Sequence, residues 1–327
     1  MSPPTSIRST LAEALRGWPP PPLDPAGPHA GLVATLSWVL FGMALAVLLM
    51  VSVALVVALA GKSEWRDRLG REWLIWSAGL ALPIVVLTGV LIYGLTATQA
   101  LSQAPQPGEM RVRVTGEMWW WRVAYLDAEG RPAIHDANEL HIPAGVPVTL
   151  ELEAADVIHS FWVPRLAGKL DMIPGRRNIL RIQADRPGVY GGQCAEYCGG
   201  PHALMGFVVV AHAPEDFQRW RAARLAPPPA APADGLAARG AQVFRDSGCG
   251  ACHRVAGTEA GGLAGPDLTF VGARRSLGAG ILANNQGTLA GWVADSQAIK
   301  PGNRMPAYRM LSGGDLRALA AYLESRR

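Results

Sequence analysis

The sequence predicts two membrane-spanning helices, then an all-β sandwich, then a small all-α domain. Three features support this order. Two long uncharged segments lie near the N-terminus, short segments of strand character follow them, and a proline-rich linker precedes a region bounded by two amphipathic helices. The length of 327 residues also exceeds one usual domain of about 100–200 residues, so more than one folding unit is expected.

The composition argues against several broad classes of protein. It is 50% hydrophobic and 17% charged, which is too apolar for a disordered protein and too poor in Lys and Glu for a long coiled coil. The net charge of +4 is modest, and the 30 Lys and Arg residues form no basic run that could follow phosphates. We therefore expect no nucleic-acid partner, and we do not expect a wholly soluble single domain.

Residues 32–60 and 73–97 carry no charged side chain, and each segment is longer than the roughly 20 residues that cross a bilayer as a helix. Buried core helices are the alternative interpretation. The loop between the two segments contains four basic residues: Lys62, Arg66, Arg68 and Arg71. Residues 19–31 and 98–110, which flank the pair, contain no Lys or Arg. By the positive-inside rule the loop is cytoplasmic, so both termini are expected on the opposite side of the membrane.

Short segments of strand character occupy the region after the second apolar segment. They are rich in β-branched and aromatic residues, and Gly- and Pro-containing turns separate them. The segments are 111–115, 119–125, 146–153, 178–182 and 207–211. Regularly spaced short strands of this kind are typical of a β-sandwich.

A linker that reads APPPAAPA at 226–233 is expected to be extended and semi-rigid. Beyond it, amphipathic helices are expected at 235–247 and 315–325, around a glycine-rich stretch. The expected parts of the chain are a proline-rich external segment 1–30, a membrane helix 31–60, a cytoplasmic loop 61–72, a membrane helix 73–99, a sandwich 108–222, a linker 223–235 and an α-domain 236–327.

All four cysteines occur in two close pairs, which favours metal or cofactor attachment over a disulfide framework. The first pair lies in CAEYCGGPHALM, from Cys194 to Met205, which places two thiols, one imidazole and one thioether in a single loop. These soft ligands suit copper better than magnesium or calcium, while a structural zinc site and a Cys194–Cys198 disulfide are the alternatives. One more imidazole is needed, and His159, at the end of an expected strand, is the candidate.

The second cysteine pair forms the c-type haem attachment pattern, Cys249-Gly-Ala-Cys252-His253. In this pattern the thiols bind the haem vinyl groups and the histidine becomes an axial ligand of the iron. Met305, in the run KPGNRMP, is the expected second axial ligand. Met310 is the alternative, although no proline follows it to stiffen the loop.

Two residues near these motifs have expected secondary roles. Pro266 follows the haem attachment motif, and its carbonyl is expected to accept the second ring proton of His253 and so to orient the imidazole. Asp156 precedes His159 by three residues and is expected to be a surface acid, with a place in a docking face as the alternative.

These motifs resemble two known families. The pattern CxExxCGxxHxxM, with HSFWVP and KxDxIPGR before it, is similar to subunit II of haem-copper cytochrome c oxidases, from the first apolar segment to about residue 220. Residues 235–327 resemble class I cytochrome c. The resemblance implies a cupredoxin-like Greek-key sandwich that holds the dinuclear copper centre CuA, followed by a class I cytochrome c domain with covalent haem c.

The resemblance to subunit II also implies roles for single residues. Cys194 and Cys198 would bridge the two coppers, and one histidine would bind each copper. Met205 would be a weak axial ligand, and Glu196 would offer its backbone carbonyl. The implied CuA ligands are His159, Cys194, Glu196, Cys198, His202 and Met205. The side chain of Glu196 would contribute to a magnesium or manganese site at a subunit interface, and Trp119 matches the exposed tryptophan through which electrons enter.

The implied function is that of an electron-input subunit in a proton-pumping terminal oxidase of a bacterial inner membrane. Electrons would pass from a soluble cytochrome c or a quinol–cytochrome c reductase, through haem c and CuA on the periplasmic side, to a haem-copper catalytic subunit I. Further membrane subunits and the lipid bilayer would be the other partners. The chain lacks the six-histidine core that reduces oxygen, so it would be part of an enzyme. A CuA-type nitric oxide reductase subunit and a stand-alone membrane electron carrier are the alternatives.

The charge distribution predicts how the last two domains meet. Residues 236–327 contain 11 basic and 6 acidic residues, whereas residues 110–220 contain 11 basic and 13 acidic residues. Opposite net charges favour encounter, and a linker raises the effective concentration of the two partners. We therefore expect the haem domain to dock transiently near Trp119.

Overall fold

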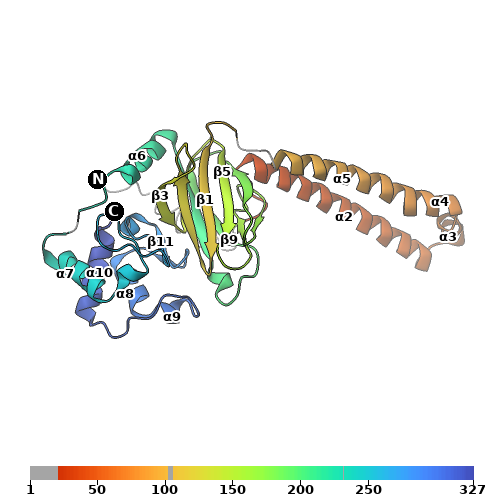
Figure 1. Cartoon of the computed structure of the whole chain (residues 1–327). Coiled ribbons are helices and arrows are strands. Elements are labelled where there is room, and N and C mark those ends of the chain that lie inside the picture. Colours follow the sequence, from red (N-terminus) through yellow and green to blue (C-terminus); the bar gives the residue numbers. More distant parts are fainter. Residues whose placement is uncertain (1–20, 102–105, 231) are drawn as a thin grey trace. The chain divides into compact units, whose positions relative to one another are not determined.

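The computed structural model describes residues 21–101, 106–230 and 232–327. These residues form two compact units, one made of residues 31–101 and the other of residues 21–30, 106–230 and 232–327. The greater part of the expected external segment, residues 1–20, lies outside the described residues, as do residues 102–105 after the second membrane helix and residue 231 of the linker. The architecture confirms the predicted fold class (Figure 1).

The first unit contains two helices that are long and apolar enough to cross a membrane, Pro28–Ala60 and Glu72–Gln99. Its elements are α2 (Pro28–Ala60), α3 (Ser63–Leu69), α4 (Glu72–Trp76), the π-helix η1 (Ser77–Ala81) and α5 (Leu82–Leu101). In the most apolar part of each span no residue is buried within the chain. The π-helix ends two residues before Pro83, which has no N–H to donate into the helix, and a wider turn can accommodate that missing bond.

The sandwich consists of ten strands in two five-stranded sheets. The strands are β1 (Met110–Glu117), β2 (Trp120–Leu126), β3 (Pro132–Ala137), β4 (Glu139–Pro143), β5 (Val148–Ala154), β6 (His159–Trp162), β7 (Leu170–Met172), β8 (Asn178–Ile182), β9 (Gly188–Cys194) and β10 (Gly206–His212). One sheet has the order β3-β2-β1-β5-β8 and the other the order β4-β10-β9-β6-β7. The pairs β1–β5 and β4–β10 are parallel, so the chain must cross between the sheets rather than turn back in hairpins.

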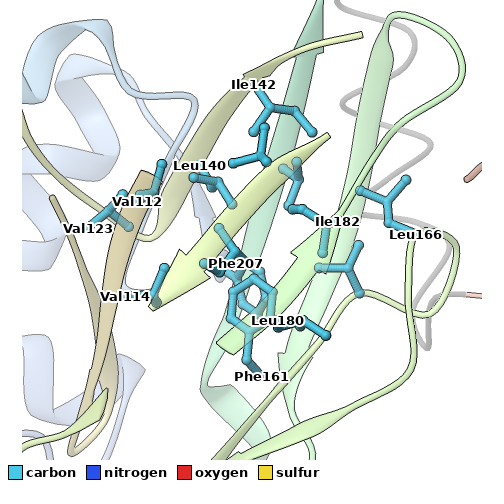
Figure 2. Packing of buried hydrophobic residues seen from close by; sticks show 14 of the residues in the cluster. Val112, Val114, Val123, Leu140, Ile142, Phe161, Leu166, Leu180, Ile182 and Phe207 are labelled. Carbon is cyan, nitrogen blue, oxygen red and sulfur yellow. The ribbon is translucent and has the colours of Figure 1, made fainter. Parts of the chain in front are cut away.

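Apolar side chains from both sheets meet in one core (Figure 2). Val112 and Val114 point inward because side chains alternate along β1. Trp121 is 1% exposed and packs against Phe207 and edge-on against Phe161, with ring centroids 4.9 and 5.8 Å away. This aromatic cluster supports β6 and β9, which carry His159 and Cys194, and β10, which follows the loop with the other candidate ligands.

The C-terminal part is helical, as predicted from residue 235 onward, whereas the helix Pro214–Leu225 lies where the sequence analysis expected the end of the sandwich and the start of the linker. Its elements are α6 (Pro214–Leu225), α7 (Gly235–Asp246), the 3-10 turns η3 (Cys249–Ala251) and η4 (Val271–Ala273), β11 (Ser276–Leu277), β12 (Leu282–Ala283), α8 (Gln286–Ala294), α9 (Ser296–Ile299) and α10 (Gly313–Ser325). Helices α7 and α10 pack closely where Gly240 meets Ala318 and Tyr322. A side chain at Gly240 would collide with this backbone, so the close packing requires glycine.

Candidate metal centres

The candidate copper loop, residues 194–205, connects two adjacent antiparallel strands. Cys194 ends β9, and Met205 directly precedes β10. The backbone N–H of Cys194 donates to the Met205 carbonyl at 3.0 Å, so the two ends of the loop are fixed to each other. A single 3-10 turn, η2 (His202–Leu204), shapes the loop in between. The sheet therefore fixes both ends of the loop, and this keeps the candidate metal ligands of the loop close together.

The sulfur atoms of this loop converge in a buried position. The Sγ atoms of Cys194 and Cys198 are 3.8 Å apart. A disulfide requires about 2.05 Å, whereas a metal bonded to thiolates at about 2.3 Å can lie between sulfurs at this separation. The Sδ atom of Met205 is 3.7 Å from Cys198 Sγ, and the Cys194 thiol donates to the Glu196 carbonyl at 3.2 Å. The geometry thus favours shared metal binding over the disulfide.

Each thiol has one imidazole beside it. Nδ1 of His202 is 3.4 Å from Cys198 Sγ, and Nδ1 of His159 is 3.9 Å from Cys194 Sγ. Ligand atoms of His159, Cys194 and Cys198 all lie within 4.8 Å of one another. The structure therefore brings together His159 and the loop ligands, as the sequence analysis expected. This soft donor set of thiolates, imidazoles and a thioether fits copper.

Electrostatics within the thiol pair favour the form that binds metal. The hydrogen bond from Cys198 lowers the pKa of the Cys194 thiol, and the His159 imidazole acts in the same direction. The same shared hydrogen bond raises the pKa of Cys198, and burial acts in the same direction. Because the thiolate is the metal ligand, the lowered pKa of Cys194 favours metal binding there, whereas a metal ion must displace the proton of Cys198.

Asp156 orients His159, a role that the sequence analysis missed. Nε2 of the fully buried His159 donates to Asp156 Oδ1 at 2.9 Å, which leaves Nδ1 facing the thiols. A carboxylate on the far ring nitrogen is the usual partner of a metal-binding histidine. The Asp156 carboxylate also accepts the backbone N–H of Met118 at 2.8 Å. Asp156 is therefore not a simple surface acid. Its position three residues before His159 was the sequence feature that could have indicated its orienting role.

Gly116 makes room for His159 and was also missed. A Cβ atom at Gly116 would lie 2.8 Å from His159 Cδ2, closer than real Cβ contacts allow. Any larger residue in this part of β1 would displace the imidazole.

Trp119 lies against the backbone of the copper loop. Its Nε1 donates to the carbonyl of Cys198 at 2.8 Å, and the indole packs half-buried against the sandwich core. A Cβ atom at Gly199 would lie 3.3 Å from the indole, a tight contact, so the glycine leaves room for Trp119 to pack against the loop. The side chain of Glu196, in contrast, is 46% exposed and lies 3.5 Å from Lys169 Nζ.

The haem attachment motif follows α7. Cys249 and Cys252 lie on either end of the η3 turn, one half-buried and the other exposed. His253 Nδ1 donates to the Pro266 carbonyl at 2.8 Å, the contact expected from the sequence, which leaves Nε2 free to face a metal. A Cβ atom at Gly265 would lie 2.5 Å from His253 Cε1, so this glycine lets the loop close over the ring.

The loop that carries Met305 is held by hydrogen bonds. Met305 packs against the core of the C-terminal domain, its N–H donates to Asn303 Oδ1 at 2.8 Å, and its carbonyl accepts from Ser296 Oγ at 2.9 Å. Met310 is 78% exposed at the surface. The structure thus favours Met305 over Met310 as a ligand held inside the domain.

The two regions match known families. Residues 128–212 match the family described as "Cytochrome C oxidase subunit II, periplasmic domain", and residues 237–327 match "Cytochrome c". The chain is 37% identical over 320 residues to cytochrome c oxidase subunit 2 of Alkalihalophilus pseudofirmus, which covers 93% of this chain and 90% of that protein. It is 31% identical over 259 residues to cytochrome c oxidase subunit 2 of Bacillus subtilis, covering 75% of this chain and 71% of that protein.

The solved periplasmic domain of subunit II of cytochrome oxidase from Bradyrhizobium japonicum is 28% identical, with a TM-score of 0.34, and the match covers 37% of this chain and 96% of that one. The sandwich region implies CuA copper and the C-terminal region implies haem, in agreement with the donor atoms described above. The chain belongs to the cytochrome c oxidase subunit 2 family, so it is a subunit of a membrane-anchored oxidoreductase complex, and it carries a cytochrome c domain.

Proposed function

We propose that this chain is the electron-input subunit of a proton-pumping terminal oxidase. Electrons would come from an external donor, a soluble cytochrome c or a quinol–cytochrome c reductase, and would pass by way of haem c and CuA to the haem-copper catalytic subunit, which reduces oxygen to water. The observation that carries this proposal is the convergence of two thiols, two imidazoles and a thioether in one buried site, within the same compact unit as the haem attachment motif.

The proposed ligands are those whose donor atoms converge. Residues His159, Cys194, Glu196 (carbonyl), Cys198, His202 and Met205 would hold CuA, and residues Cys249, Cys252, His253 and Met305 would hold haem c. When bound, two coppers bridged by two thiolates would share one electron, and haem c would supply a second one-electron centre.

The residues of the chain keep the copper site rigid and dry. Cys194, Cys198 and Met205 are 6%, 3% and 1% exposed, so little water reaches the two thiols and the thioether. Asp156 and Gly116 fix the ring of His159 from two sides. A site that is held in this way changes little when its charge changes, which favours fast electron transfer.

Trp119 is the proposed residue through which electrons reach the copper loop. Its indole nitrogen is hydrogen-bonded to the carbonyl of Cys198, a proposed bridging ligand. This bond gives a direct link between an aromatic ring outside the loop and the loop itself.

The proposed location is a bacterial inner membrane, with both termini and both metal-binding domains on the periplasmic side. The four basic residues of the loop between the spans support this orientation. The proposed partners are the catalytic subunit I and further membrane subunits. The half-exposed Glu196 carboxylate is available for a magnesium or manganese ion whose other ligands come from a partner chain.

Purification of the native complex tests the proposal. We expect it to contain a haem-copper subunit, to consume oxygen with reduced cytochrome c as donor, and to release protons. The double variant Cys249→Ser, Cys252→Ser should lose covalent haem and keep its copper. A complex that reduces nitric oxide and not oxygen, or a chain that is purified without any haem-copper partner, would contradict the proposal.

A further inference from the structure

The sandwich and the C-terminal domain share buried charged groups within one compact unit. Asp136 of β3 forms an ion pair with Arg274 at 2.7 Å, and the two side chains are 3% and 6% exposed. Glu139 of β4 is 1% exposed, and its Oε1 accepts the backbone N–H groups of Arg275 at 2.6 Å and Ser276 at 3.0 Å. These contacts join the edge of the sandwich to the segment that leads into β11.

Lys300 forms a third buried contact, close to the copper loop. Its side chain is 2% exposed, and its ammonium group donates to the carbonyls of Trp119 at 2.6 Å, Leu204 at 2.8 Å and Gly278 at 3.0 Å. An ammonium group has three N–H donors, so all three are used. Two acceptors belong to the sandwich, and Gly278 lies between β11 and β12 of the C-terminal domain.

The loop that leads from Lys300 to Met305 connects the two candidate metal centres. Asn303 donates to the Lys300 carbonyl and accepts the Met305 N–H, both at 2.8 Å. Arg304 pairs at 3.4 Å with Asp156, the residue that orients His159. One short segment of the C-terminal domain is thus bonded to both sides of the copper site.

Buried charges of this kind specify one arrangement of two surfaces. In any other register the ammonium of Lys300 and the carboxylate of Glu139 would be desolvated without partners, which is strongly unfavourable. The net charges of the two domains predicted an encounter between exposed surfaces, whereas the contacts described here exclude water.

We propose that the C-terminal domain stays docked on the sandwich in a single register, and that Lys300 is the positioning residue that sets this register at the copper loop. The inference rests on the proposed function, because it names the residue that holds the haem-binding domain in place for electron transfer. It replaces the expectation of transient docking.

The test compares the full chain, loaded with both cofactors, with Lys300→Met, which keeps side-chain length and removes the donors. Arg239→Met is the matched control, because it removes one positive charge from an exposed ion pair of the same domain. The first readout is hydrogen exchange of two amides that are bonded across the interface, Gly206 to Ala279 and Ser276 to Glu139. The second is the rate of haem-to-copper transfer after photoreduction, measured at low and high salt.

We expect slow exchange of both amides and a salt-independent transfer rate in the unchanged chain and in Arg239→Met. Lys300→Met should exchange at least tenfold faster and transfer at least tenfold more slowly, with unchanged haem and copper content. Fast exchange in the unchanged chain, or identical results for Lys300→Met, would overturn the inference. Slow exchange without any haem-to-copper transfer would instead overturn the proposed function and leave the docking intact.

If Lys300→Met binds less haem or copper, Asp136→Asn provides the second test. It weakens the buried pair with Arg274 and is not part of the proposed copper loop. Faster exchange of the Ser276 amide in this variant would support the fixed interface, and unchanged exchange would contradict it.

Discussion

Replacement of Asp156 by Asn should weaken copper binding without removing any ligand. The Asp156 carboxylate accepts the Nε2–H of His159 at 2.9 Å and the N–H of Met118 at 2.8 Å. Asn has nearly the same size and keeps one acceptor oxygen, but it loses the negative charge that holds the imidazole with Nδ1 toward the thiols. The perturbation therefore acts mainly on the orientation and basicity of His159, and it also weakens the contacts of Asp156 with the Met118 N–H and with Arg304.

The magnitude follows from the environment of the carboxylate. Loss of the partner that orients a metal-binding histidine typically costs about 10–100-fold in metal affinity, or about 1.4–2.8 kcal/mol. The Asp156 side chain is only 14% exposed, so water can replace little of the lost interaction. We expect the affinity of Asp156→Asn to fall within this range.

Competition with a copper chelator, on the full chain in detergent, measures this affinity, and the electron paramagnetic resonance spectrum reports changes at the copper site. Asp185→Asn is the control, because Asp185 is exposed. A spectrum and an affinity for Asp156→Asn equal to those of the control would refute the orienting role.

Two further predictions concern positions next to the ligands. Gly116→Ala should destabilise the copper-loaded domain by about 1–3 kcal/mol, as overpacking does, because the new methyl group collides with His159. Gly188→Ala in β9 is the control, because its methyl group makes only ordinary contacts. Thermal or denaturant unfolding measures the difference in stability. Met305→Ala should keep the covalent haem but lower its reduction potential, because the thioether ligand is lost. Met310→Ala should leave the reduction potential unchanged in a redox titration, because Met310 is exposed. A lower potential in Met310→Ala and an unchanged one in Met305→Ala would make Met310 the ligand.

The sequence predicted the copper-loop ligands because they are local. Five of the six proposed donors lie within residues 194–205; the two thiols, the imidazole and the thioether were found from their spacing, whereas the Glu196 carbonyl was implied only by the resemblance to a family. His159 is 35 residues away from Cys194; it was named because the loop needed one more imidazole, and the resemblance to a family then supplied its ligand role. The strand that carries Cys194, β9, was not predicted, because its sequence GVYGGQC is rich in glycine and lacks the alternation of apolar residues.

The residues that support the site could not be predicted from spacing. Gly116 meets His159 only because β1 and β6, which belong to different sheets, pack face to face. Lys300 donates to the backbone carbonyls of Trp119, Leu204 and Gly278. Every residue type has such a carbonyl, so the sequence does not show which residues accept these hydrogen bonds. Counts of charged residues predicted that the two domains attract each other, but they carried no information about which charges become buried.

Metal analysis combined with electron paramagnetic resonance of the purified full chain tests the central claim most directly. If Cys194 and Cys198 bridge two coppers, the chain should contain two coppers and one covalent haem. The oxidised copper signal should then show hyperfine coupling of one unpaired electron to two equivalent copper nuclei. A single copper with its electron localised on one nucleus, or a single zinc ion in the site, would contradict the account.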